Sequence, residues 1–346
     1  MEKKKIVITG GAGFVGSQLG YCLDKKGYKV LLLDDMSFGY ENNLTINDES
    51  FGEFVRFDIR SGDLEKHFYN TDCVFHLAAI SALPVCQSDP MLAMSVNVAG
   101  TVNVLEAARR ANVRRVVFAS TSAIYENNTE FPCKEDDSVR PTLIYAVSKF
   151  NAEHLCRVYG ETYGMEIVIL RYYNVYGPNQ DFRRKSPPFI SYIIRELLNN
   201  RAPILHSDGK QERDYVYIDD VNELNILCMN HPAAFGKTFN VASGQVYSVN
   251  EIYEIIADIL ESSLKPVFRK AANFWDKYPE LFQGEHSLKR ELLEREVNKF
   301  TLGSTEKAEQ LLSWKTIMPI KKGLKLTIEH TAENIRSMTC DKSYIF

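Results

Sequence analysis

Tyr145 and Lys149 are the two side chains whose types and spacing could do chemistry. They stand four residues apart in a stretch with helical periodicity, 145–162, so both lie on one face of the expected helix. A free phenol, with a pKa of about 10, is a poor base at neutral pH. An ammonium about 4 Å away favours the phenolate by about 4 kcal/mol at an effective dielectric of about 20. We therefore expect Lys149 to lower the pKa of Tyr145 to about 7, where the phenol can exchange a proton with a substrate hydroxyl.

Such a pair is common by chance, so its surroundings decide whether it is a site. The expected strand 115–119 is followed by three hydroxyl side chains, Ser120, Thr121 and Ser122. Hydroxyls at the carboxyl end of a strand lie where doubly wound sheets bind their ligands. One of these hydroxyls could hydrogen-bond the same substrate oxygen as Tyr145.

A glycine-rich turn joins the first expected strand to the first expected helix. Gly10, Gly13 and Gly16 have the spacing that allows a tight turn, close approach of a pyrophosphate and helix–strand packing. The free N–H groups at the start of the helix would bind the pyrophosphate. Asp34 ends the second expected strand, where a carboxylate accepts hydrogen bonds from an adenosine ribose and repels a 2′-phosphate. Together these residues predict a site for NAD rather than NADP.

The elements that position these residues alternate between short apolar runs and helical patterns. The expected strands are 5–9, 29–34, 53–57, 73–77, 115–119 and 166–171, and the expected helices are 13–26, 61–69, 90–111 and 145–162. This alternation predicts an α/β fold with a doubly wound parallel sheet (Rossmann) and a smaller C-terminal substrate-binding lobe. We expect the NAD-binding domain to be 1–178 with returning segments around 213–247, and the lobe to be 179–212 and 248–346.

The second half of the chain is harder to interpret. Helices are expected at 189–199 and 249–260, with a further strand at 238–242. The stretch 270–296 is aromatic-rich and then highly charged, which fits either a lid over the site or a helical surface insertion. Arg183, Arg184 and Lys185 stand in a Pro-rich loop, where they are either solvated or help to hold a phosphorylated substrate.

Composition excludes several classes of protein. Of 346 residues, 45% are hydrophobic and 25% charged, and the net charge of -4 gives no basic field for nucleic acid. We find no signal peptide and no uninterrupted apolar stretch near the ~20 residues that a membrane span needs. The seven cysteines are odd in number and form no C-x-x-C pair, so we expect reduced thiols, no metal site and a cytoplasmic protein.

Several motifs in one order resemble the extended short-chain dehydrogenase/reductase family. Within it the chain is similar to the nucleotide-sugar epimerases and dehydratases, and above all to UDP-sugar 4-epimerases. The segments that carry the resemblance are 9–16, 76–79, 119–125, 145–149, 171–178 and 208–221.

The resemblance implies a role for each matching position. Tyr145, Lys149 and Thr121 would be catalytic, with Ser122 as an alternative hydroxyl. Asn174 and Arg213 would bind the substrate, together with a late arginine for which Arg295 is the candidate. Taken alone, Asp58 would rather cap a helix starting at Ser61. The residues implied for NAD are Gly10, Gly13, Phe14, Val15, Gly16, Asp34, Asp58, Ile59, Ala78, Ala79, Asn97, Ser120, Tyr145, Lys149 and Tyr172.

The resemblance also separates the reactions of the family. A 4,6-dehydratase has an Asp-Glu pair where this chain has Ser122 and Ala123, and a decarboxylase typically has Glu in place of Ala123. Alanine cannot transfer a proton, so a 4-epimerase acting on a nucleotide-diphosphate sugar, by default UDP-linked, is the leading hypothesis. A dehydratase, a decarboxylase, a 4-dehydrogenase and a non-catalytic NAD-binding protein remain alternatives.

Three departures from the family pattern bear on the sugar. Glu126 stands where the family usually has glycine, Pro84 and Cys86 fall in a loop that often touches the sugar, and 270–296 is longer than usual. The resemblance finally implies a homodimer, formed by the helices 90–111 and 145–162.

Overall fold

A seven-stranded parallel sheet forms the centre of the molecule, as expected for a doubly wound α/β fold. The structure, a computed structural model, describes residues 3–46 and 49–340, with side chains described as far as residue 336. Across the sheet the strands run in the order β12-β8-β7-β6-β1-β2-β5. Their bounds are β1 Lys5–Thr9, β2 Lys29–Asp34, β5 Glu53–Arg56, β6 Thr71–His76, β7 Arg115–Thr121, β8 Glu166–Tyr172 and β12 Thr238–Val241.

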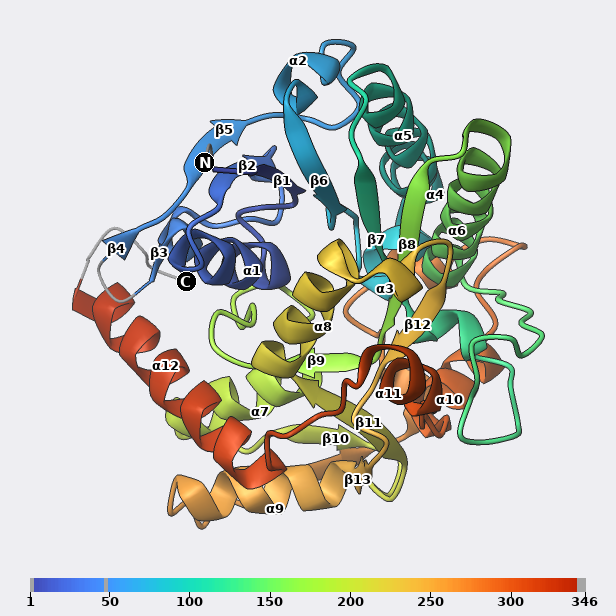
Figure 1. Ribbon diagram of the computed structural model, residues 1–346. Coiled ribbons are helices and arrows are strands. Elements are labelled where there is room, and N and C mark those ends of the chain that lie inside the picture. Colours follow the sequence, from blue (N-terminus) through green and yellow to red (C-terminus); the bar gives the residue numbers. More distant parts are fainter. Residues whose placement is uncertain (1–2, 47–48, 341–346) are drawn as a thin grey trace.

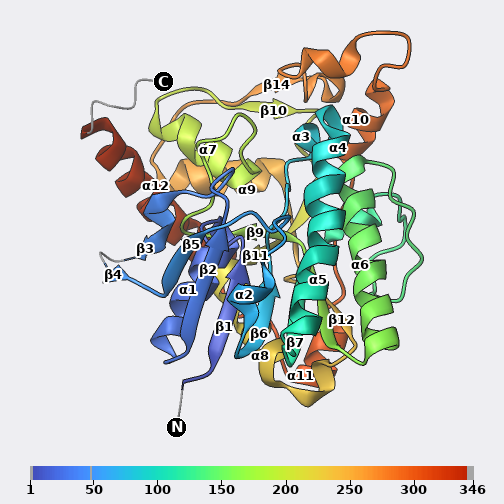
Figure 2. The same cartoon turned by 90° about the horizontal axis from the view of Figure 1, so that it is seen from above.

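The strands are mostly apolar along their length because helices cover both faces of the sheet. All seven residues of β7 are buried, as expected of a strand between two helical layers. Helices α1 (Phe14–Lys25) and α8 (Ile218–Asn230) pack on one face, and α5 (Gly100–Arg110) and α6 (Ile144–Tyr163) on the other (Figures 1 and 2). From β1 the chain winds outward to β2 and β5, then returns to β6 and winds the other way. The strand order therefore reverses between β1 and β6, which is where such sheets bind their ligands.

Two of the expected helices differ from the structure. The helix expected at 61–69 is a single turn, α2 (Glu65–Phe68), so the expectation that Asp58 caps a helix at Ser61 is wrong. Asp58 pairs with Arg60 instead, at 2.6 Å. The helix expected at 90–111 is α4 (Pro90–Met94), a π-helical turn (Ser95–Ala99) and α5.

This composite helix bears on the expectation that the chain has no apolar stretch long enough to span a membrane. By length and composition the run Pro90–Arg110 could cross a membrane, although polar residues interrupt it. About 44% of its most apolar window is buried inside the molecule, as in the core helix of a folded domain.

Most of the remaining elements gather beside the carboxyl ends of the sheet strands, whereas α11 (Glu306–Leu312) packs on β12 and on the turn that precedes it (Figures 1 and 2). Strand β11 pairs with β9 in parallel and with β13 antiparallel, and β10 pairs with β14 in parallel. The bounds of these strands are β9 Asn174–Tyr176, β10 Ile204–His206, β11 Glu212–Tyr217, β13 Val246–Ser248 and β14 Val267–Arg269. The other elements are β3 Thr45–Ile46, β4 Glu49–Ser50, α3 Leu83–Ser88, α7 Phe189–Leu198, α9 Val249–Ile259, α10 Arg290–Asn298, α11 Glu306–Leu312 and α12 Ile320–Cys340.

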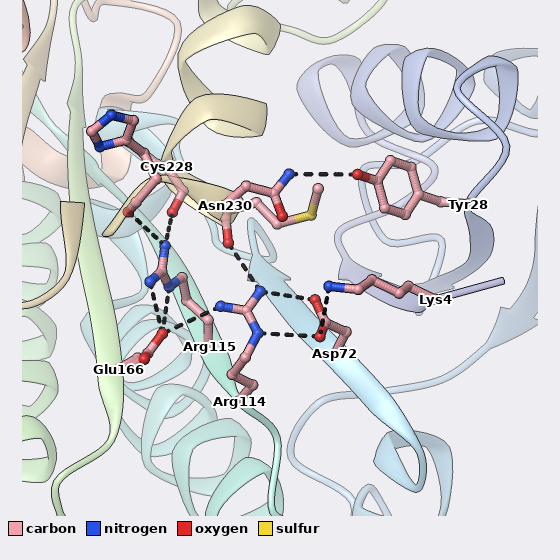
Figure 3. A network of polar contacts seen from close by, with 10 residues as sticks. Lys4, Tyr28, Asp72, Arg114, Arg115, Glu166, Cys228 and Asn230 are labelled. Carbon is pink, nitrogen blue, oxygen red and sulfur yellow. Dashed lines mark hydrogen bonds and ion pairs between the residues drawn. The ribbon is translucent and has the colours of Figure 1, made fainter. Parts of the chain in front are cut away.

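A polar network at the opposite edge of the sheet ties α8 to the strands (Figure 3). The Arg115 guanidinium, only 3% exposed, donates to the carbonyls of Cys228 and His231 at 2.8 and 3.0 Å and pairs with Glu166 at 2.7 Å. It thereby satisfies carbonyls at the end of α8 that lack a partner within the helix. Arg114 lies beside it, 37% exposed, and pairs with Asp72 at 2.8 Å.

We predict that Arg115→Leu lowers the free energy of unfolding by about 2–4 kcal/mol, because buried carbonyls lose their donors and Glu166 its partner. Arg114→Ala is the control and should cost less, about 1 kcal/mol, since Arg114 is 37% exposed, although it too donates to an α8 carbonyl, that of Met229 at 3.1 Å. Urea denaturation of both variants measures the difference. Equal losses would contradict this account of the network.

Candidate active site

One large cavity lies between the carboxyl ends of the sheet and the elements beside them. Its volume is about 1020 Å³, at the upper end of the range for small-molecule sites and large enough for two ligands. Every residue expected in the cofactor, catalytic or substrate site lines it, except Asn97 and Arg295. The cavity therefore brings the two ends of the expected site together.

The glycine turn forms the floor of the cavity where α1 begins. Gly10 has a φ of +74°, and a Cβ on Gly16 would lie 2.1 Å from the carbonyl oxygen of Gly10. Only glycine allows such a turn. Helix α1 starts at Phe14 with no side-chain cap, so its first N–H groups are free to bind an anion. These features fit the pyrophosphate of a dinucleotide.

Asp34 stands beside this turn at the end of β2. Its carboxylate accepts hydrogen bonds from the N–H groups of Ala12, at 3.0 Å, and Met36, at 2.9 Å. Burial raises its pKa, and the two N–H donors act in the opposite sense. Each oxygen keeps a second acceptor site, which fits the two hydroxyls of an adenosine ribose.

The far end of the cofactor side is formed by Asp58, Ile59 and Arg60, all of which line the cavity. Arg60 holds the pKa of Asp58 below its usual range. Arg60 was not expected in the site, because its only sequence signal was a position next to the Asp58-Ile59 pair.

Asn97 lies behind the cavity wall rather than in it. Its amide nitrogen donates to the Ser148 hydroxyl and the Ile80 carbonyl, both at 3.0 Å, and its oxygen accepts from the Ile80 N–H at 2.8 Å. It therefore joins the loop after β6, which carries Ala78 and Ala79, to the helix that carries Tyr145.

The catalytic end of the cavity centres on Tyr145, in the first turn of α6. Thr121, the strand-end hydroxyl that the resemblance implied, lies beside this phenol in the cavity wall. Burial raises the pKa of Tyr145 to about 12, and Arg184 and Thr121 only partly oppose that rise. The expectation that Lys149 brings this pKa to about 7 is wrong for the protein without ligands.

The main reason is burial of the phenol, and Lys149 is desolvated as well. Its side chain is 2% exposed, its ammonium lies 4.2 Å from the centre of the Phe118 ring, and burial lowers its pKa to about 8. Removing both groups from water favours their neutral forms more than their spacing on the helix favours the charged pair.

A buried ion pair lies directly behind this end of the site. Glu153, one helical turn after Lys149, accepts from the Ser120 hydroxyl at 2.5 Å and pairs with Arg171 at 2.9 Å. Neither charged side chain is more than 3% exposed. The pair fixes Ser120, which lines the cavity, to the helix that carries Tyr145 and Lys149.

The substrate side is formed by Asn174 and Arg213, which come from the neighbouring strands β9 and β11. The Arg213 guanidinium donates to the Val297 and Glu296 carbonyls at 2.7 and 3.2 Å, at the end of α10. Arg295 is exposed on α10 and donates to the Thr142 hydroxyl at 3.2 Å. It does not reach the cavity, whereas Lys299 lines it.

Residues 270–296, which we call the strap, form part of the cavity wall. Asn273, Phe274, Trp275, Asp276 and Lys277 line the cavity. Behind them, Trp275, Tyr278, Leu281 and Leu293 pack on Leu143 and Leu83 in a small hydrophobic cluster. The strap is therefore both an insertion with its own core and a wall of the site.

Glu126 is one of the departures that the sequence raised, and its carboxylate faces the start of α6. It accepts from the Leu143 N–H at 3.0 Å, the Thr142 hydroxyl at 2.7 Å and the Thr142 N–H. Cys86 is a buried free thiol on α3, and the six cysteines whose side chains are described are all free.

Several residues that line the cavity had no signal in the sequence. They lie on the loop after β2, on β10 and on β14, and include Phe38, His206 and Arg269. Short strands with mixed composition and irregular loops show no periodicity, so only the folded chain brings these residues to the site.

The family described as NAD dependent epimerase/dehydratase matches residues 6–242, which include the glycine turn, Tyr145 and Arg213. The chain belongs to this family.

Three relatives show the range of its members. A putative UDP-glucose 4-epimerase of Methanocaldococcus jannaschii is 34% identical, over 96% of this chain and 100% of that one. A UDP-N-acetyl-alpha-D-glucosaminuronate decarboxylase of Bacillus cytotoxicus is 33% identical, over 77% and 83%. The crystal structure of UDP-glucuronic acid 4-epimerase from Bacillus cereus, in complex with UDP-glucuronic acid and NAD, has a TM-score of 0.81 at 26% identity, over 95% and 99%. Members of the family are NAD-dependent enzymes that act on nucleotide sugars, and NAD is the cofactor.

We predict that Lys149→Met stabilises the ligand-free protein while removing a residue of the site. A pKa lowered from 10.5 to about 8 means that folding disfavours the charged lysine by about 3 kcal/mol. Below pH 8 both folded and unfolded wild-type chains carry the charge, so the variant should be more stable by up to that amount. As the pH rises from 8 to 10.5 the folded wild type loses the lysine proton before the unfolded chain does. The difference in free energy of unfolding between the wild type and the variant should therefore disappear. Urea denaturation at pH 7 and pH 10 tests both signs, and a less stable variant at pH 7 would contradict the assignment.

Proposed function

We propose that this enzyme is an NAD-dependent 4-epimerase of a nucleotide-diphosphate sugar, by default a UDP-hexose. The observation that carries the proposal is that one cavity is lined by the Tyr145 phenol with Thr121 beside it, by the glycine turn at one end and by Arg213 at the other. A sugar placed between these ends would present a hydroxyl to Tyr145 and a diphosphate to Arg213 and Asn174.

In this proposal the chain's own residues bind, orient and move a proton. Tyr145 takes the proton from the C4 hydroxyl, and the Thr121 hydroxyl fixes the phenol and its sugar oxygen in place. Lys149, buried behind the pair, supplies the positive charge that stabilises the phenolate once a substrate is bound. Bound NAD supplies the hydride acceptor and donor. Because the same tyrosine can return the proton to either epimer, no second acid or base is needed.

The wall around Tyr145 supports epimerisation over the reactions that need a carboxylate. Ser122 and Ala123, next to Thr121, line the cavity and have no acidic group. The nearest acidic side chain along the chain, Glu126, is held by Thr142 and Leu143. A water elimination or a decarboxylation at this wall would lack the acid that assists it.

We predict that the purified protein converts a UDP-hexose or a related UDP-sugar to its C4 epimer, followed by NMR over a panel of UDP-sugars. A 4-keto-6-deoxy sugar or released carbon dioxide would show a different reaction of the family. No turnover of any sugar with NAD supplied would favour a binding protein instead.

Tyr145→Phe should reduce turnover by roughly 10²–10⁴-fold, the usual contribution of a positioned acid–base group. Thermal unfolding should change little, because only one hydroxyl is lost. Retained activity would remove Tyr145 from this role.

We also propose that the enzyme is a cytoplasmic homodimer that pairs through α4, α5 and α6. Large apolar side chains are exposed on these helices: Met91 is 80% exposed, Tyr163 53% and Val158 37%. The resemblance that implies a homodimer names the same helices, and these exposed side chains would be covered by such a pairing.

Size-exclusion chromatography with light scattering should show a dimer for the wild type. The double variant Met91→Asp/Val158→Asp should shift it to a monomer, because two buried charges oppose association. A monomeric wild type would contradict the proposal.

A further inference from the structure

Three consecutive cations, Arg183, Arg184 and Lys185, reach three different parts of the molecule. The Arg183 guanidinium lies 4.0 Å from the centre of the Tyr40 ring, and the Lys185 ammonium lies 4.3 Å from that of Tyr278 in the strap. Arg184, between them, lines the cavity. The loop 179–186 therefore connects the cofactor side of the cavity to the strap.

Tyr40 belongs to the loop that follows Asp34, and this loop also lines the cavity, through Phe38 and Gly39. The Tyr40 N–H donates to the Ala12 carbonyl at 3.2 Å, and the Asn43 amide donates to the same oxygen at 2.9 Å. Tyr40 is thereby fixed to the glycine turn, where the pyrophosphate of NAD would bind.

Two contacts join Tyr40 to the loop 179–186. Burial raises the pKa of its phenol, and the nearby Asp181 carboxylate adds to that rise. The same carboxylate accepts a hydrogen bond from the Arg183 N–H at 2.8 Å. The Arg183 guanidinium stacks over the ring, and its buried Nε has no hydrogen-bond partner among the residues that the structure describes. Aromatic rings, those of Tyr40 and Phe182, are thus the main contacts of this cation.

The two loops lie 143 residues apart in the sequence and meet at the edge of the cavity, and each also lines it. The residues next to Tyr40 and Arg183, namely Gly39 and Arg184, line the cavity whose floor is the glycine turn, so the Tyr40–Arg183 contact joins two parts of the wall around the place where NAD would bind. We propose that Tyr40, Asp181 and Arg183 form a clasp that retains bound NAD.

Retention of NAD by the clasp would be needed during each reaction cycle, and this consequence rests on the proposed function. An epimerase uses the same dinucleotide twice in one cycle, so loss of the reduced cofactor would strand the oxidised sugar. Retention of NAD itself is measured without any sugar, so its outcome is independent of which reaction the enzyme catalyses.

The test loads the whole protein with NAD and removes free dinucleotide on a desalting column. At successive times the NAD still bound is released by heat denaturation of the protein and quantified by chromatography. Arg183→Met and Tyr40→Leu should each release NAD on the order of tenfold faster, as expected for a partly buried cation–π contact. Arg183→Lys should lie near the wild type. The double variant Tyr40→Leu/Arg183→Met should be no faster than the single variants, because both remove one contact.

A matched control is Lys25→Met, which removes a cation over the Tyr21 ring at 5.4 Å, away from the cavity and from the proposed dimer helices. It should leave NAD release unchanged. The clasp is ruled out if Arg183→Met and Tyr40→Leu release NAD at the wild-type rate, or if their effects add fully in the double variant. Should either of them fail to fold in a thermal scan, Arg183→Gln decides: it keeps a polar side chain but loses the cation over the Tyr40 ring, and it must still release NAD faster than the wild type.

Discussion

The constraint on which the rest of the structure depends is the parallel sheet buried on both faces. Because all seven strands point the same way, every strand ends at one edge, and every loop that follows a strand is placed there. The reversal of strand order between β1 and β6 opens a crevice at that edge. The glycine turn after β1 and Thr121 at the end of β7 come to one cavity for this reason, although more than a hundred residues separate them.

Desolvation sets the chemical character of that cavity. Burial raises the pKa of Tyr145 to about 12 and lowers that of Lys149 to about 8, so at neutral pH the phenol is neutral and the lysine carries its charge in a desolvated place. The protein thus keeps an uncompensated lysine in its interior, which costs folding free energy. A ligand that brings charge to this end would change the balance, and the site is built for an occupied cavity rather than an empty one.

The sequence was sufficient for the sheet and for the parts of the site that lie directly after strands. Apolar runs and helical periodicity predicted all seven strands of the sheet within two residues at each end. The spacing of the glycines, Asp34 and the Tyr145–Lys149 pair predicted residues that line the cavity. It failed where tertiary environment decides. The pKa of Tyr145 depends on burial, which residue spacing does not reveal. Arg295 has the sequence position of a substrate-binding arginine but lies outside the cavity. Strands β10 and β14 are too short to show periodicity. The roles of the site residues and the division into two domains stay predictions.

Arg213 has a consequence that reaches beyond its own position. Its guanidinium holds the last carbonyls of α10, where the strap ends, and the same side chain lines the cavity at the substrate end. A diphosphate that recruited this cation would compete with the Val297 carbonyl for its N–H groups. Occupancy of the cavity and anchoring of the strap are therefore linked equilibria, and by reciprocity whatever loosens the strap must change the affinity for the diphosphate by the same factor. Specificity for the sugar and release of the product would then be governed by one shared hydrogen-bond donor.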